Sequence, residues 1–415
     1  MKKFYSFLLF MVFWGPPKFG FERDPLAVRD NPLMLNPIQT LKVGLWILTG
    51  IVVVLLFLNA VVFRKKKFRF NPETRFFLGF ILIAILTSYV SLNKLYTWFS
   101  IYQLLVFFGF VYFLAFSRIL SFEEIFNILM TVFVVNVLII MGAFLIKPEL
   151  VSIKTSVFGV RITGAPLIPD YGGSGLFAFT FLLLKKRMTN SKLTGMDTFL
   201  LVLSLVYVLL SRTRSGILLL ILVVLLYLYY FKNLRAIYIY LFIMITLVVN
   251  FLNVEGDIFT FLVRETRSLS TLSNRLNMWS AALGLFEQRP FTGVGYLGFR
   301  SYYDILGFGD SHNSYIEILV GTGIMGFLLY VMSLVLLLRR YIKNLRINEF
   351  YPMLAFFSLV ILLILSFAAT AIAVPGMTYF LLITILIYSL TLIKRANGYL
   401  TDTTGKAVPT ILRSY

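Results

Sequence analysis

Apolar residues gather into long runs along this chain, and short polar tracts separate the runs. A helix needs about 20 mostly apolar residues to cross a hydrocarbon core about 30 Å thick. Because such runs recur from one end of the chain to the other, we predict an all-α polytopic membrane protein with about twelve transmembrane helices in one membrane domain, residues 1–415. The predicted spans are 4–19, 41–63, 75–92, 95–116, 123–146, 171–184, 196–211, 215–231, 236–252, 314–338, 350–370 and 374–393.

The first of these runs, 4–19, is weak, as is 171–184. It follows Lys2-Lys3 as the apolar core of a signal peptide would, but Gly15-Pro16-Pro17 stands where an Ala-x-Ala cleavage site is expected. We therefore expect a retained first helix, with a cleaved signal peptide as the alternative.

Composition and charge support a lipid environment and suggest an orientation in it. Hydrophobic residues make up 59% of the chain and charged residues 13%, against about 25% charged in a soluble domain. The net charge of +20 is spread over short tracts between apolar runs, at 64–67, 185–187 and 339–340. Such tracts mark cytoplasmic loops, so we expect both termini in the cytoplasm and no nucleic-acid partner. The polar segments 15–40, 147–170 and 253–313 are then extracytoplasmic.

Arginine dominates these outer segments, whereas the cytoplasmic tracts mix in many lysines. The planar fork of arginine binds phosphate or carboxylate through two parallel bonds, which a lysine ammonium does not do. The chain has no cysteine and one histidine, which excludes disulfides and thiolate catalysis and argues against a His-rich metal site. We expect anion binding without a metal or another cofactor. The outer arginines include Arg161, Arg212, Arg214, Arg264, Arg267, Arg275, Arg289 and Arg300.

Two outer turns are candidate binding segments. Arg212-Thr213-Arg214 joins two apolar runs, and two arginines beside small hydroxyl residues can hold a diphosphate. An ordinary helix–helix turn with snorkelling arginines is the alternative. Arg161 and Asp170, in another outer loop, are candidates to line an outward cavity, and a solvated loop is the equal alternative.

The long outer segment 253–313 contains a predicted interfacial helix at 273–286. Leu276, Trp279, Leu283 and Phe286 recur at helical spacing and form one apolar face. With Ser273 or Asn274 as the cap, Arg275 would lie in the first turn. A helix N-terminus already favours an anion there, so we expect Arg275 to bind one.

This outer segment ends at His312, in Asp310-Ser311-His312-Asn313-Ser314-Tyr315. A lone histidine at a helix end is often only a polar residue. His312 is also the one group of the chain with an ordinary pKa near neutrality, about 6.5, and thus the natural general base. Asp310, Asn313 and Glu317 are near enough in sequence to orient it. The following Gly321-x-Gly323-x-x-Gly326 lies in an apolar helix, where it favours close packing over dinucleotide binding.

Together these motifs resemble the bacterial O-antigen ligase and polymerase superfamily. The strongest match is Arg275, then Trp279, Pro290-Phe291-x-Gly293-Val294-Gly295, His312-Asn313-x-Tyr315 and a glycine-rich helix. Arg214-Ser215-Gly216 is a second match. The segment from Arg161 to Gly173 is a weaker third, in which Asp170 stands after the proline where an Asn is common. The large outer loop between the ninth and tenth helices fits as well.

The resemblance implies a metal-independent, inverting membrane glycosyltransferase. Such an enzyme takes a glycan from an undecaprenyl-diphosphate carrier at the outer face of the bacterial cytoplasmic membrane and transfers it to an acceptor hydroxyl. Arg214 and Arg275, assisted by Arg212, would bind the diphosphate, and His312 would take the acceptor proton. Asn313 and Tyr315 are further candidates to line the substrate cavity, and other polysaccharide-assembly proteins are candidate partners.

Within this family the motifs leave two activities open. We favour a polymerase of O-antigen or capsule repeat units, with an O-antigen ligase that transfers polymer to the lipid A core as the alternative. A polysaccharide transporter or flippase is a more distant alternative. A transporter would place ionisable residues near the middle of its helices and carry an internal repeat, and the sequence has no evident repeat.

Overall fold

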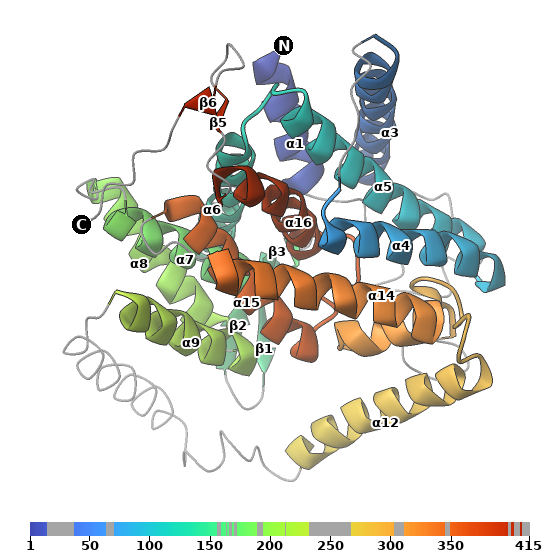
Figure 1. The fold of residues 1–415 in the computed structure, drawn as a ribbon. Helices are drawn as coiled ribbons and strands as arrows, with labels where there is room; N and C mark the ends of the chain where they lie inside the picture. The colour runs from blue at the N-terminus through green and yellow to red at the C-terminus, as the bar shows by residue number, and fades with distance from the viewer. Residues whose placement is uncertain are drawn as a thin grey trace.

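The computed structural model describes residues 1–14, 37–63, 70–155, 159–162, 164–165, 168–169, 172–188, 194–211, 213–231, 267–302, 311–344, 349–396, 400–401 and 407–408. Within these residues the protein is a helical bundle with short antiparallel hairpins (Figure 1). The α-helices are α1 (Lys2–Trp14), α3 (Pro37–Leu58), α4 (Pro72–Thr87), α5 (Lys94–Phe116), α6 (Phe122–Ile146), α7 (Gly173–Met188), α8 (Gly195–Leu210), α9 (Arg214–Tyr230), α12 (Arg267–Gln288), α14 (Ser314–Asn344), α15 (Phe350–Ala368) and α16 (Met377–Ala396).

Shorter elements complete the described structure. A π-helical turn at Asn59–Phe63 follows α3, and 3₁₀ turns occupy Ser88–Val90, Pro148–Leu150 and Gly298–Tyr302. The hairpins pair β1 (Ser152–Thr155) with β2 (Gly159–Ile162), β3 (Gly164–Ala165) with β4 (Ile168–Pro169), and β5 (Leu400–Thr401) with β6 (Ala407–Val408).

Six of the described helices are long and apolar enough to cross a membrane. They are Thr40–Val62, Pro72–Val90, Lys94–Phe116, Phe122–Ile146, Ser314–Lys343 and Phe350–Ala368, and three shorter apolar helices lie at Gly195–Leu210, Ser215–Tyr230 and Met377–Ser389. The prediction of a helical membrane protein is confirmed. The predicted span 236–252 falls outside the described residues. The total of twelve spans, the cytoplasmic termini and the domain limits stay predictions.

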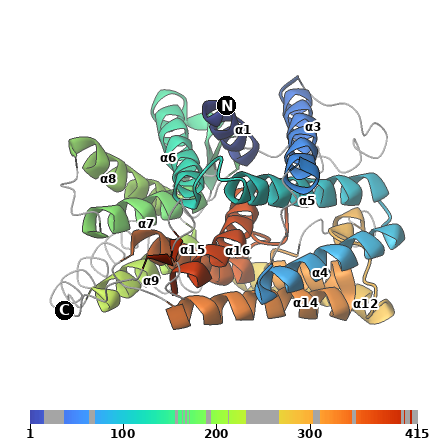
Figure 2. The same ribbon diagram turned by 45° about the horizontal axis from the view of Figure 1, so that its top comes forward.

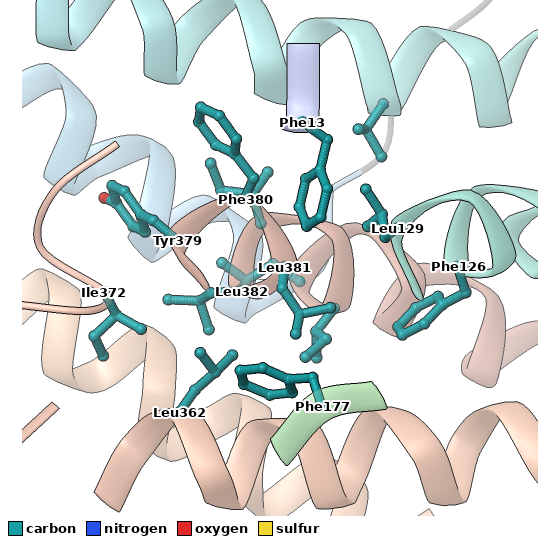
Figure 3. Close-up of a cluster of buried hydrophobic side chains, with 14 of the residues drawn as sticks. Phe13, Phe126, Leu129, Phe177, Leu362, Ile372, Tyr379, Phe380, Leu381 and Leu382 are labelled. Carbon is teal, nitrogen blue, oxygen red and sulfur yellow. The ribbon is translucent and has the colours of Figure 1, made fainter. Parts of the chain in front are cut away.

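Helix α16 lies at the centre of the bundle, between α5 on one side and α14 and α15 on the other (Figure 2). Its side chains at 379–383 are all fully buried. Phe380 stacks on Phe107 of α5 with ring centroids 4.1 Å apart, and Phe13, Leu129, Phe177 and Leu362 surround the same helix from α1, α6, α7 and α15 (Figure 3). Because α16 contacts helices from all parts of the chain, its first residues are held firmly where the candidate site lies.

Two buried polar clusters join separate helices. The carboxylate of Glu73, in the first turn of α4, is 2.6 Å and 2.9 Å from Arg340 of α14 and accepts a hydrogen bond from Ser389 of α16. Elsewhere Asn136 of α6 accepts a hydrogen bond from Trp14, the last residue of α1, and donates one to Ser174 at the start of α7. A buried charge or amide is stable only when paired in this way, so each cluster specifies which helices lie together.

Helix α14 is broken at Gly323, whose backbone (φ 67°, ψ −176°) is far from helical. The break releases the carbonyl of Val320 and the N–H of Ile324. They bond to Val294 N at 2.9 Å and to Pro290 O at 2.8 Å. The Pro290-Phe291-x-Gly293-Val294-Gly295 motif is therefore docked into the break. The predicted packing role of the glycine-rich segment is confirmed, with the difference that Gly323 receives this loop, while Gly326 faces α4.

Candidate active site

The turn that carries His312 projects the histidine outward from a buried support. The His312 side chain is exposed, while Ser311 and Asn313 on either side are buried. The backbone of His312 has φ 50°, a left-handed conformation that residues other than glycine rarely adopt. Asn313 caps α14, because its Oδ1 accepts hydrogen bonds from the N–H groups of Tyr315 and Ile316. The end of the predicted outer segment is thus a rigid turn with one exposed titratable side chain.

Ser311 is held by two other elements. Its hydroxyl lies 3.1 Å from Oε2 of Glu317, one turn into α14, and its N–H is directed at the same oxygen at 3.5 Å. Its carbonyl accepts a hydrogen bond from the indole N–H of Trp279 in α12, at 2.9 Å. Of the three residues predicted to orient His312, Asn313 and Glu317 contact its turn, and Asp310 lies outside the described residues.

Helix α12 brings Arg275 to the same region, but in a different way from that predicted. The helix begins at Arg267, two turns before the predicted cap, because the helical spacing of Leu276 and Trp279 extends back through Leu272 and Leu269. Arg275 therefore lies within the helix, and the prediction that it shares an anion with the helix N-terminus was wrong. Its Nη2 is instead 3.5 Å from the carbonyl oxygen of Ala368, the last residue of α15. The negative end of the α15 dipole favours this position for a cation.

The apolar face of α12 also differs in part from the prediction. Trp279 and Phe286 are half-buried, and Phe286 packs with Ala282 and Leu285 against the docked loop and α14. Leu276 and Leu283, on another side of the helix, are 55% and 39% exposed. The interfacial prediction would place those two leucines toward lipid, and it stays a prediction.

The linker 369–376 between α15 and α16 is a part of the site that the sequence did not reveal. It is not helical, and side chains from several elements bond to its backbone. Ser314 Oγ donates to Ala369 O and accepts from Ile372 N, while the hydroxyl groups of Tyr330 and Tyr296 donate to Ile372 O and Ala373 O. Backbone polar groups that are buried need hydrogen-bond partners, and these side chains supply them where the linker is not helical. The linker is composed mainly of Ala, Ile and Val, so its only signal in sequence was Pro375-Gly376, which precedes a helix.

The linker and the end of α15 therefore lie between the turn of His312 and the helix of Arg275. Ser314, two residues after His312, contacts the first residue of the linker, and Arg275 contacts the residue just before it. Tyr296, which follows the docked loop, contacts the linker further on. Burial raises the pKa of Tyr296 well above its ordinary value of 10.0, so the phenol stays a neutral hydrogen-bond donor.

The Arg212-Thr213-Arg214 turn lies beside the third motif. A Cβ on Gly172, which has φ +90°, would be 2.5 Å from Ser211 Oγ and 3.8 Å from Thr213 Oγ1, so the start of α7 touches this turn. Arg214 is the first residue of α9. Its side chain, Arg212 and Asp170 lie outside the described part of the chain, as does the side chain of Arg161, whose backbone pairs with Ile153 in β1. Whether this turn and Arg275 meet at one diphosphate stays a prediction.

The remaining candidates, Asn313 and Tyr315, make contacts inside the protein. Asn313 is 5% exposed and caps α14. The hydroxyl of Tyr315 donates to Leu363 O, and its ring packs on Phe367 at 4.7 Å between centroids. Among the described residues, no group of three or more His, Asp and Glu side chains is arranged to hold a metal ion. The arrangement combines the exposed imidazole of His312 with the Arg275 guanidinium, which contacts the last residue of α15 just before the linker. Such a pairing is suited to proton transfer and anion binding.

Comparison with known proteins gives these motifs a context. Residues 199–331 match the family model described as O-antigen ligase, and the match includes Arg214, Arg275 and His312. An uncharacterized protein of Haemophilus influenzae is 28% identical over 106 residues, covering 23% of this chain and 26% of the relative. The alignment thus spans about a quarter of that relative. The family match confirms, over residues 199–331, the resemblance of this membrane protein to the O-antigen ligase and polymerase superfamily.

Proposed function

We propose that this protein is a metal-independent, inverting glycosyltransferase of the bacterial cytoplasmic membrane. Its donor is an undecaprenyl-diphosphate-linked glycan, and its acceptor is a sugar hydroxyl at the extracytoplasmic face. The product is a surface polysaccharide such as O-antigen or capsule. The observation that carries the proposal is that the turn of His312 and the helix of Arg275 are bonded to each other through Trp279 and Ser311, within the segment that matches the O-antigen ligase model.

Each of the two groups suits one half of a glycosyl transfer. His312 accepts the proton of the acceptor hydroxyl while the hydroxyl oxygen bonds to the anomeric carbon, opposite the diphosphate. The bond from that carbon to the diphosphate oxygen breaks, and its electron pair leaves with the carrier. Arg275, with Arg214 and Arg212, stabilises the added negative charge. Preorganised arginines provide this stabilisation without a metal ion.

The identity of the acceptor separates the two candidate activities. We favour a polymerase, which adds repeat units to a growing glycan on its carrier. The matching family model supports a transferase of the O-antigen ligase and polymerase type and does not separate the two activities. Both reactions use the same leaving group and the same base, so the chemistry of the site does not distinguish between them.

Complementation of a gene-deleted strain of the source organism tests the proposal. His312→Ala, Arg275→Ala and Arg214→Ala should each abolish the surface glycan at normal expression. Arg289→Ala, which removes an exposed arginine of the same segment, should restore it. Accumulation of single-repeat products indicates a polymerase, and accumulation of carrier-linked polymer indicates a ligase. Normal glycan from all three site variants would contradict the proposal.

A further inference from the structure

We propose that Glu317 is a positioning residue for His312, acting through Ser311. The inference rests on the proposed role of His312 as general base. It assigns a function to a carboxyl group that does not itself reach the reacting atoms and that the family resemblance did not single out.

The contacts of Glu317 place it beneath the catalytic turn. It is 1% exposed, in a helix long and apolar enough to span a membrane. Oε2 is 3.1 Å from the hydroxyl of Ser311 and 3.5 Å from its N–H. The same hydroxyl is 2.9 Å from Asn313 O and accepts from Asn313 N at 3.3 Å. The carboxyl oxygen therefore contacts Ser311 Oγ, the atom through which Ser311 is hydrogen-bonded to Asn313 across His312.

The backbone of His312 explains why such fixing is needed. A histidine at φ 50° is strained, and strained conformations persist at functional sites only when their surroundings hold them there. Trp279 holds the Ser311 carbonyl from α12, and the cap holds Asn313. Glu317 holds the Ser311 hydroxyl, which also bonds to the Asn313 backbone and so bridges the turn. Without the carboxyl group the turn can relax toward an extended φ, which would redirect the imidazole.

A role in the helix dipole alone does not account for this geometry. A carboxyl group in the first turn of α14 is favoured by the helix N-terminus wherever it points. Glu317 instead faces back across the turn to Ser311, and it is buried rather than solvated. The two explanations differ in what they predict for catalysis. A dipole role affects only the stability of α14, whereas positioning affects the catalytic step.

Kinetics of the full-length protein in nanodiscs provide the test. The probe is the lipid-linked glycan extracted from the gene-deleted source strain. Glu317→Ala should lower kcat by about 10–100-fold through a misplaced base, with an apparent KM for the donor within about threefold, because Arg275 is untouched. Glu317→Gln keeps an acceptor oxygen for Ser311 and should restore kcat to within about threefold of wild type. Glu287→Ala, an exposed carboxylate on α12, is the matched control.

A double-mutant cycle separates positioning from a general structural effect. In His312→Gly protein assayed with added imidazole, Glu317→Ala should cause no further loss, because it acts only through the missing side chain. Where Glu317→Ala does not fold, Ser311→Ala removes the hydroxyl contact to Glu317, together with those to Asn313, and takes its place. Wild-type kcat in Glu317→Ala, or a full additional loss in the His312→Gly background, would overturn the proposal. Full activity of His312→Gly without imidazole would instead overturn the proposed base.

Discussion

Gly323 in the break of α14 permits the sharpest test of how the site is held together. We predict that Gly323→Ala lowers the free energy of unfolding by about 3–5 kcal/mol. A backbone with φ 67° and ψ −176° is essentially restricted to glycine and costs another residue about 1–3 kcal/mol. An added Cβ would also lie 2.2 Å from Phe291 O, so the docked loop must move.

The displacement of the loop accounts for the rest of the predicted loss. The hydrogen bonds from Val294 N to Val320 O and from Ile324 N to Pro290 O join the loop to the break. Each bond contributes about 0.5–1.5 kcal/mol, and more where a buried partner is left unsatisfied. Since native proteins are stable by about 5–15 kcal/mol, a loss of this size is large enough to measure in detergent or nanodiscs.

Denaturation of the purified full-length protein, followed by tryptophan fluorescence, is the appropriate assay. Gly284→Ala is the matched control, because Gly284 lies within α12 and a Cβ there has nothing within 4 Å. This control should be neutral or stabilising by up to about 1 kcal/mol. If Gly323→Ala and Gly284→Ala unfold with the same free energy, the docked break does not exist as described.

Three further predictions address the site and its support. Arg275→Lys should lose most of the glycan-forming activity in the complementation assay despite the retained charge. Lysine lacks the planar fork that binds a diphosphate through paired bonds. Surface glycan like that of the wild type would contradict this prediction. Tyr296→Phe should destabilise the protein by about 1–3 kcal/mol by leaving the buried Ala373 carbonyl without its phenol donor, whereas Tyr89→Phe at an exposed position should not. Burial raises the pKa of Tyr296 above its ordinary value of 10.0, so the phenol stays protonated in the folded state at and below pH 10. The loss of unfolding free energy caused by Tyr296→Phe should therefore be the same at pH 6 and pH 8. Transfer activity should persist after prolonged treatment with a chelator such as EDTA, and loss that added Mg²⁺ or Mn²⁺ restores would refute a metal-independent reaction.

The described helices could largely be predicted from hydropathy, because a membrane helix needs a long apolar run whatever it packs against. The limits of α5 and α6 agree with their predicted spans to within about a residue. Candidate residues could also be selected without the fold, since arginine and a single histidine stand out in an apolar chain. Their catalytic and binding roles stay predictions. The local motif around His312 even indicated Asn313 and Glu317 as its neighbours, because a turn and the helix that follows it are close in sequence.

What only the tertiary structure decided are contacts between residues far apart in the chain. The bond from Trp279 to Ser311 and that from Arg275 to Ala368 join separate elements, and the linker 369–376 has almost no polar side chain to draw attention to it. The start of α12 was misplaced because Ser273 and Asn274 are residues that favour a helix cap, and here they lie inside the helix. Hydropathy and local motifs determined which residues form helices and which can do chemistry. The tertiary structure decided which of these residues meet. Backbone groups freed at the break in α14 and along the linker need hydrogen-bond partners, and residues far away in the sequence supply them.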